Sequence, residues 1–254
     1  MIQLQFAEKE YIYLYAHLIN VKRWYLSTDK EIEKAKASFA TKGYCILDVN
    51  GIFADSLASI SEMIELTDAT SWTYVINHDE FSGDLPKTTK SEILVAHRER
   101  ALKDNSEGKL AFYFERLTTD HNLNMGGAPM ALVYSRRLME SKEMKNLLEL
   151  ITNRTVLNME QLYINKFNIG DFLGVHRDGG NNVGVALNIT KGWLAANGGN
   201  THILNESMEI VDSLSPKYGK ILIFDSRKAN VPHFVSSVTA TNGTSRMAIV
   251  GRYN

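Results

Sequence analysis

A histidine and an aspartate stand two positions apart in the segment Gly174-Val175-His176-Arg177-Asp178, which has the pattern of an extended strand. Side chains two positions apart in a strand leave on the same face, so His176 and Asp178 can reach one ion together. Such a pair supplies two of the three protein ligands of a non-haem iron site, and a histidine from elsewhere completes the set. Because the chain has seven histidines, a chance pair of this kind is common. Its weight therefore depends on the rest of the sequence.

The third ligand that we predict is His233, which follows Pro232 at the start of a short apolar strand. Further along, Arg246 enters a strand that is otherwise apolar, Met247-Ala248-Ile249-Val250. A buried guanidinium requires a partner. A dicarboxylate co-substrate would supply one, through the paired hydrogen bonds that arginine makes better than lysine.

A second match to the histidine-x-acid pattern is His97-Arg98-Glu99, within a predicted helix over 91–102. Side chains at positions i and i+2 of a helix diverge, so this pair cannot bind one ion. We therefore expect these residues to form a solvated helix face.

Helical periodicity gives way to short strand-like runs near Arg154. Before this point we expect helices over 8–20, 30–40, 55–66, 91–102 and 141–153, strands over 44–49 and 110–117, and polar loops over 77–90 and 120–129. After it, apolar runs at 161–167, 183–190, 202–204, 210–211, 220–224, 234–238 and 247–250 are spaced for a β-sandwich or barrel. The candidate ligands all lie in this second part.

Composition narrows the classes of function. Of the 254 residues, 44% are hydrophobic and 22% are charged, which is typical of a globular protein, and the length allows one domain. The formal net charge of −1 indicates no basic surface for nucleic acid, and no apolar run reaches the length of a membrane span. The single cysteine, Cys45, fits a buried strand in a reducing compartment. Without a signal peptide pattern at the N-terminus, we expect a cytoplasmic protein.

Residues from about 158 to 253 resemble the iron(II)- and 2-oxoglutarate-dependent dioxygenases, particularly the small prolyl-hydroxylase-like branch near the amino-acid hydroxylases and radical halogenases. The landmarks that carry this resemblance are, in order, Gly170-Asp171-Phe172-Leu173, His176 with Asp178, Leu187-Asn188, Trp193, Gly198-Gly199, Pro216-Lys217-Tyr218-Gly219-Lys220, Ile223-Phe224, His233 and Arg246. The resemblance implies an α+β fold with a double-stranded β-helix (jelly roll) core over 155–254 and N-terminal helices packed on the sheet. Residues 1–254 would form a single dioxygenase domain, of which 1–154 is the helical and loop-rich part.

The resemblance also implies roles for individual residues. His176, Asp178 and His233 look like the catalytic ligands of iron(II), and Arg246 like the partner of the distal carboxylate of 2-oxoglutarate, with dioxygen as the third reactant. Other candidates are Tyr163 and Asn165 as contacts of the co-substrate; Arg252 as a fallback anchor, a substrate contact or a surface charge; Glu115, Arg116 and Asp120 as contacts of charged substrate groups or as solvated or structural residues; and Trp193 and His202 as structural residues.

The predicted function is hydroxylation of a small substrate, a free amino acid or related metabolite. In this family 2-oxoglutarate is decarboxylated to succinate and CO2, and a ferryl species abstracts hydrogen before hydroxyl rebound. Asp178 fills the position at which radical halogenases have glycine or alanine, so hydroxylation is favoured over halogenation, while desaturation and ring closure stay open. The alternatives are a protein prolyl or lysyl hydroxylase and a non-catalytic metal-binding jelly-roll module. The sequence leaves the oligomeric state open.

Overall fold

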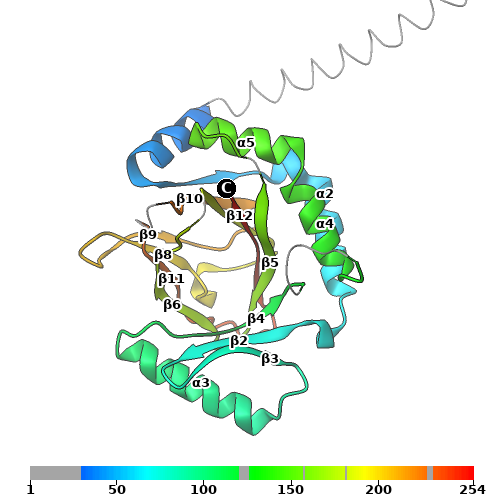
Figure 1. The fold of residues 1–254 in the computed structure, drawn as a ribbon, viewed down its shortest axis with the longest axis vertical. Helices are drawn as coiled ribbons and strands as arrows, with labels where there is room; N and C mark the ends of the chain where they lie inside the picture. Colours follow the sequence, from blue (N-terminus) through cyan, green and yellow to red (C-terminus); the bar gives the residue numbers. More distant parts are fainter. Residues whose placement is uncertain (1–29, 120–125, 157, 181, 228–230) are drawn as a thin grey trace, which may run out of the picture.

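The computed structural model of the chain describes residues 30–119, 126–156, 158–180, 182–227 and 231–254. The helix expected over 8–20 and the candidate residue Asp120 lie outside these ranges. Within them, a single curled antiparallel sheet of twelve strands dominates, and helices pack on its outer surface (Figure 1). The predicted α+β class with a jelly-roll type of sheet is confirmed.

The sheet has one continuous path of strands that are neighbours through hydrogen bonds, from β1 through β10, β7, β12, β5, β4, β6, β11 and β8 to β9. These strands are β1 (Tyr44–Asp48), β4 (Phe112–Leu117), β5 (Met159–Phe167), β6 (Phe172–His176), β7 (Val183–Asn188), β8 (Thr201–Leu204), β9 (Ile210–Leu214), β10 (Lys220–Asp225), β11 (His233–Val235) and β12 (Arg246–Tyr253). All of them overlap a strand-like run in the sequence, because each alternates or concentrates apolar residues over a strand's length.

The N-terminal part contributes strands as well as helices to this sheet. The loop predicted over 77–90 is wrong, because β2 (Thr73–His78) and β3 (Phe81–Pro86) form a hairpin there and β2 also pairs with β4. Of the described strands, β3 pairs with β2 alone, so it is an edge strand whose residues alternate between half-buried and exposed. An edge strand carries polar and turn-forming residues that resemble a loop in sequence.

Four helices cover the same side of the sheet: the helix over residues 30–42, which confirms the one predicted over 30–40, α2 (Asn50–Glu65), α4 (Met130–Met139) and α5 (Lys142–Thr152) (Figure 1). On α5, Met144, Leu147, Leu148 and Ile151 are buried, as their helical spacing predicts. No helix was predicted over α4, which nevertheless packs against α2 and β5. The main core lies between these helices and the sheet, so the sheet's inner face is left for a cavity.

A further helix, α3 (Ser91–Ser106), lies apart from the others, against β2 and β4 (Figure 1). The expectation of a solvated face at His97 and Arg98 is wrong, since both side chains are half-buried. The ring of His97 hydrogen-bonds to His78, and Arg98 forms an ion pair with the buried Asp171 at 2.9 Å. Within the described ranges, no helix combines the length and the apolar character that crossing a membrane requires.

Candidate metal centre and its cavity

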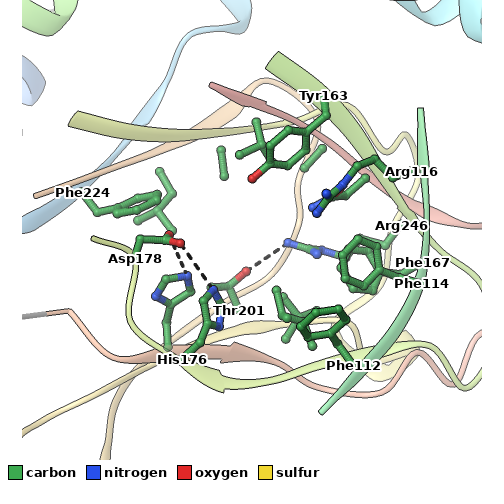
Figure 2. A pocket seen from close by; sticks show the side chains of 18 of the residues that line it. Phe112, Phe114, Arg116, Tyr163, Phe167, His176, Asp178, Thr201, Phe224 and Arg246 are labelled. Carbon is green, nitrogen blue, oxygen red and sulfur yellow. Dashed lines mark hydrogen bonds and ion pairs between the residues drawn. The ribbon is translucent and has the colours of Figure 1, made fainter. Parts of the chain in front are cut away.

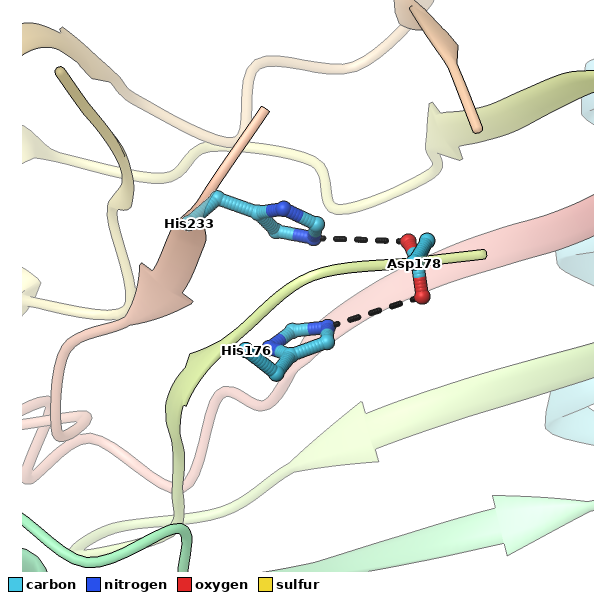
Figure 3. Close-up of side chains that lie close together, drawn as sticks. All are labelled: His176, Asp178 and His233. Carbon is cyan, nitrogen blue, oxygen red and sulfur yellow. Dashed lines mark ion pairs between the residues drawn. The ribbon is translucent and has the colours of Figure 1, made fainter. Parts of the chain in front are cut away.

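Strand pairing brings the two candidate histidines together. In the antiparallel pair of β6 and β11, His176 lies directly opposite His233, and the centroids of their rings are 4.2 Å apart. Asp178 follows the end of β6, and its carboxylate lies beside the two rings with one oxygen facing each (Figure 3). His176 Nε2 is 3.7 Å from Asp178 Oδ1, and His233 Nε2 is 3.6 Å from Asp178 Oδ2. The three residues that the sequence singled out thus converge on one point, with ligand atoms within 4.8 Å of one another.

Both imidazoles are held by backbone carbonyls. His176 Nδ1 lies 3.0 Å from the carbonyl oxygen of Gly174, and His233 Nδ1 lies 2.9 Å from that of Val231. Because a carbonyl oxygen only accepts, each Nδ1 carries the hydrogen, and in a neutral ring Nε2 has the free lone pair. Burial and the neighbouring His176 hold the pKa of His233 below its ordinary range, so its ring is neutral at pH 7. Two lone pairs therefore face a carboxylate, an arrangement that a divalent cation between them would stabilise.

The carboxylate of Asp178 is fixed by Arg252, on β12. Arg252 Nη2 donates to Asp178 Oδ1 at 2.6 Å, whereas Oδ2 is buried and has no hydrogen-bond partner. The guanidinium of Arg252 also lies over the ring of Phe224, 5.0 Å from its centroid. A Cβ at the neighbouring Gly184 would come within 2.3 Å of that ring and 2.7 Å of Arg252 Nη1, so only glycine leaves them room. The unpartnered Oδ2 is the atom that fits a metal ion.

The buried position of Arg252 corrects one reading of the sequence. Its side chain is 10% exposed, so the interpretation as a surface charge is wrong. The sequence did contain an indication of this position. Arg252 and Arg246 are an even number of residues apart in β12, so they lie on the same face of the strand, and both face the cavity. The ion pair with Asp178 depends on strands that are distant in sequence, so no local pattern indicates it.

A cavity of about 200 Å³ extends from these residues across the inner face of the sheet. Figure 2 shows His176 and Asp178 on one side of it and Arg116 and Arg246 on the other. Aromatic rings of Phe112, Phe114 and Phe167 line the wall below the two arginines in this view.

Arg246 is a buried cation without an anionic partner among the described residues. Its Nη2 donates to Thr201 Oγ1 at 3.1 Å, and its guanidinium lies 4.7 Å from the centroid of the Phe167 ring. Its Nε is buried and makes no hydrogen bond. Burial lowers the pKa of Arg246 to about 10, which still leaves it protonated at neutral pH. An anion in the cavity would therefore be strongly favoured beside it.

Tyr163 and Asn165 lie on β5 and face the cavity, as their alternation predicts. Across the strand pair, Arg116 is the register partner of Asn165, and its Nε donates to Asn165 Oδ1 at 3.2 Å. The neighbouring Glu115 points to the opposite face of the sheet, where it accepts from Lys87 at 2.6 Å and Lys166 at 3.2 Å. Of the two adjacent candidates on β4, only Arg116 lines the cavity.

Trp193 and His202, which we predicted to be structural residues, make their contacts away from the cavity. Trp193 is buried and its Nε1 donates to the carbonyl oxygen of Gly198 at 3.0 Å. The ring of His202 stacks on Phe234 at 4.6 Å, and burial lowers its pKa. Neither residue lines the cavity.

A second group of histidine and aspartate, His78, Asp79 and Asp104, lies between β2 and α3. His78 Nδ1 accepts from the N–H of Glu80 at 3.2 Å, so its Nε2 donates to His97 Nδ1 at 2.8 Å. Asp104 accepts from the N–H of Asp79 at 2.7 Å and from Lys109 at 3.0 Å. These contacts already satisfy the buried atoms, and we do not interpret this group as a metal centre.

Comparison with known proteins agrees with this geometry. Residues 162–254 match the model of the 2OG-Fe(II) oxygenase superfamily, and this segment contains the His176, Asp178, His233 group and Arg246. None of the curated protein sequences matches the chain. Over residues 162–254 the chain is therefore similar to the 2OG-Fe(II) oxygenase superfamily, whose description implies iron(II) and 2-oxoglutarate as cofactor and co-substrate.

Solved structures share the fold at low sequence identity. An oxidoreductase of the 2OG-Fe(II) oxygenase family from Burkholderia pseudomallei is 15% identical, with a TM-score of 0.60 over 88% of this chain and 90% of that one. A prolyl hydroxylase from Trichoplax adhaerens, in complex with a peptide of hypoxia inducible factor, is 15% identical, with a TM-score of 0.56 over 91% and 92%. A non-heme alpha ketoglutarate dependent epimerase from nogalamycin biosynthesis is 13% identical, with a TM-score of 0.54 over 89% and 83%. These similar scores single out no branch of the superfamily.

Proposed function

We propose that this protein is a single-domain iron(II)- and 2-oxoglutarate-dependent hydroxylase of a small molecule, with a free amino acid or related metabolite as the leading class. The observation that carries the proposal is that a ligand group with an unsatisfied carboxylate oxygen, His176, Asp178 and His233, lies across one cavity from Arg246, a cation with no anionic partner among the described residues. When bound, iron and 2-oxoglutarate supply the oxidation of a C–H bond by dioxygen, with release of succinate and CO2.

In this proposal the protein's own residues hold and orient these groups. Nε2 of His176, Nε2 of His233 and the buried Oδ2 of Asp178 are the ligand atoms, and Arg252 keeps the carboxylate in place through Oδ1. A set of two histidines and one carboxylate leaves metal positions free for co-substrate and dioxygen. The side of the metal centre that faces the cavity would therefore bind the reactants. The backbone carbonyls behind the two imidazole rings fix the histidine ligands.

Arg246 is the proposed site for the distal carboxylate of 2-oxoglutarate. Its guanidinium is oriented by Thr201 and the Phe167 ring, so a carboxylate can form charge-assisted bonds without reordering the side chain. Tyr163 and Asn165 complete this side of the cavity with polar groups. The aromatic wall excludes water, which strengthens these contacts.

The size of the cavity supports a small substrate. Pockets for drug-sized ligands are about 300–1,000 Å³, whereas this one is about 200 Å³ and must also take the co-substrate. A compact metabolite fits this limit. One side chain of a peptide would also fit, which keeps a protein prolyl or lysyl hydroxylase as the alternative.

The test measures succinate formed by the full chain with iron(II), 2-oxoglutarate and dioxygen, in the presence of pooled amino acids or of peptides containing proline and lysine. We expect amino acids to stimulate succinate formation above the uncoupled background. Stimulation by peptides alone would favour the protein hydroxylase. If no charge-transfer absorption appears with iron(II) and 2-oxoglutarate under anaerobic conditions, the proposed function is wrong.

A further inference from the structure

We propose that Arg116 binds a carboxylate of the substrate, so that the substrate is a small carboxylic acid oxidised at a carbon away from that group. This inference rests on the proposed function, because it assigns the co-substrate to Arg246 and the metal to the opposite side. It names a substrate class and a specificity residue in the N-terminal part of the chain.

The guanidinium of Arg116 is held in a defined orientation. Its Nε is committed to Asn165 Oδ1 at 3.2 Å, and its central carbon lies 4.2 Å from the Tyr163 ring centroid and 5.4 Å from that of Phe114. These contacts leave its terminal amino groups, Nη1 and Nη2, as the donors without a protein partner among the described residues. Two parallel donors at the end of a fixed planar group match the geometry of a carboxylate.

The balance of charge in the cavity calls for an additional anion. Among the described residues, its lining includes three arginines, Arg116, Arg246 and Arg252, and one acidic residue, Asp178. Asp178 already pairs with Arg252. Iron(II) and the dianion of 2-oxoglutarate carry opposite charges of equal size, so loading the site leaves the excess of two positive charges unchanged. A substrate carboxylate would compensate part of that excess in a water-poor site.

The acidic side chain of the neighbouring Glu115 cannot neutralise the charge of Arg116. Glu115 is adjacent to Arg116 in sequence, but it faces the other side of the sheet and is paired with Lys87 and Lys166. Strand alternation places neighbouring residues on opposite faces, so Glu115 cannot turn toward the cavity without breaking these contacts. Among the described residues, no carboxylate therefore pairs with Arg116, and its terminal amino groups can bind a ligand.

Arg116 and Arg246 are suited to different carboxylates. Arg246 is 4% exposed and bonds to Thr201, whereas Arg116 is half-buried and comes from another strand, β4. One carboxylate of 2-oxoglutarate would reach the metal, and the other would bind Arg246. Both acidic groups of the co-substrate are then occupied. Arg116 is then left for the second ligand. Since it lies across the cavity from His176 and Asp178 (Figure 2), the oxidised carbon would be remote from the carboxylate, as in an amino-acid side chain.

The experiment titrates the full chain, loaded anaerobically with iron(II) and 2-oxoglutarate, with free amino acids and small aliphatic and aromatic carboxylic acids, each beside its primary amide. Calorimetry reads binding of every compound, and the charge-transfer band reads the affinity for 2-oxoglutarate. The variants are Arg116→Gln, Arg116→Lys and Arg246→Gln. Arg100→Gln is the matched control, because Arg100 pairs with Glu80 on the surface and does not line the cavity.

We expect at least one acid to bind the parent about 10- to 100-fold more tightly than its amide, which is the scale of hydrogen bonds to a charged group. Arg116→Gln should remove this preference, Arg116→Lys should keep part of it, and Arg100→Gln should leave it unchanged. The affinity for 2-oxoglutarate should fall in Arg246→Gln and stay at the parental value in Arg116→Gln.

Three results would overturn the inference: no acid in the panel binds, the acid preference survives in Arg116→Gln, or that variant loses 2-oxoglutarate as Arg246→Gln does. A parent that forms no charge-transfer band contradicts the proposed function instead. Calorimetry still decides the role of Arg116 in that case, because acid binding that depends on Arg116 needs no band to be detected.

Discussion

Two groups of histidine and aspartate in the described part of this chain differ in how their polar atoms are satisfied. Around His78 and Asp104, each buried nitrogen or oxygen has a donor or acceptor of matching type. Around His176 and His233, the backbone fixes both rings with Nε2 toward a carboxylate whose Oδ2 has no hydrogen-bond partner. Similar residue types therefore form a closed structural network in one region and an open ligand group in the other.

This difference shows that proximity alone is a poor criterion for a metal centre. Both groups bring three potential ligand atoms within 4.8 Å of one another. The two groups differ in whether their buried polar atoms have hydrogen-bond partners. Such atoms are nearly always paired, so a buried atom without a partner points to a missing ligand. The same criterion identifies Arg246 as a position for an anion.

The largest expected effect comes from removing the carboxylate of the open group. Asp178→Ala should weaken iron(II) binding by more than about 100-fold, because even contacts that only support a ligand are worth about 10- to 100-fold. Iron content after dialysis and the charge-transfer band measure this change. Asp104→Asn is the matched control and should bind iron as the parent does. Equal losses of iron binding in both variants would show that the two groups do not differ in this way.

The next largest effect is expected at Arg246, the buried cation without an anionic partner among the described residues. Arg246→Gln should raise the dissociation constant of 2-oxoglutarate by roughly 30-fold or more, the scale for one partner of a buried charge pair. Titration of the charge-transfer band provides the measurement, and iron binding without co-substrate serves as the control. An unchanged affinity would mean that the distal carboxylate binds elsewhere.

A smaller effect is expected at Arg252, which orients Asp178 from the side away from its free oxygen. Arg252→Gln should weaken iron binding by about 10- to 100-fold, less than the loss of the ligand itself. Arg252→Lys should recover part of it, since an ammonium can still donate to Oδ1. Iron titration of the three proteins would contradict this role if Gln and Lys behaved alike.

The smallest effect is expected at Asp104, in the group whose buried polar atoms are already paired. The N–H of Asp79 and the ammonium of Lys109 hold the pKa of Asp104 at about 2, below its ordinary value. A carboxylate with a lowered pKa stabilises the fold above about pH 4 and loses this contribution as the pH falls toward about 2. The difference in unfolding midpoint between the parent and Asp104→Asn should therefore shrink over that range. A difference that stays constant with pH would contradict a structural role.

Much of the fold could be predicted because its signals are local. The strands from β5 onward alternate or concentrate apolar residues, and α5 carries its buried side chains at helical spacing. The β2–β3 hairpin could not be recognised, since Ser82, Gly83 and Asp84 resemble a loop until β2 is known to pair with β4 on its other edge. Strand identity there depends on a distant neighbour.

The candidate site divides in the same way. The sequence singled out His176, Asp178, His233 and Arg246 from residue type and order, and alternation placed Tyr163 and Asn165 toward the interior. It misplaced His97 and Arg98, because their partners, His78 and Asp171, belong to other elements. It also left Arg116 and Glu115 as equivalent candidates.

Residue type and order along the chain are enough to show which side chains are available to bind a metal and an acid. The folded sheet is needed to show that Arg252 holds Asp178 and that Arg116 faces the cavity while Glu115 faces Lys87. The physical reason is that ion pairs and orphaned atoms arise between strands whose register is fixed by packing of the whole sheet. Periodicity shows which face a residue takes within its own strand, whereas its partner is set by the fold.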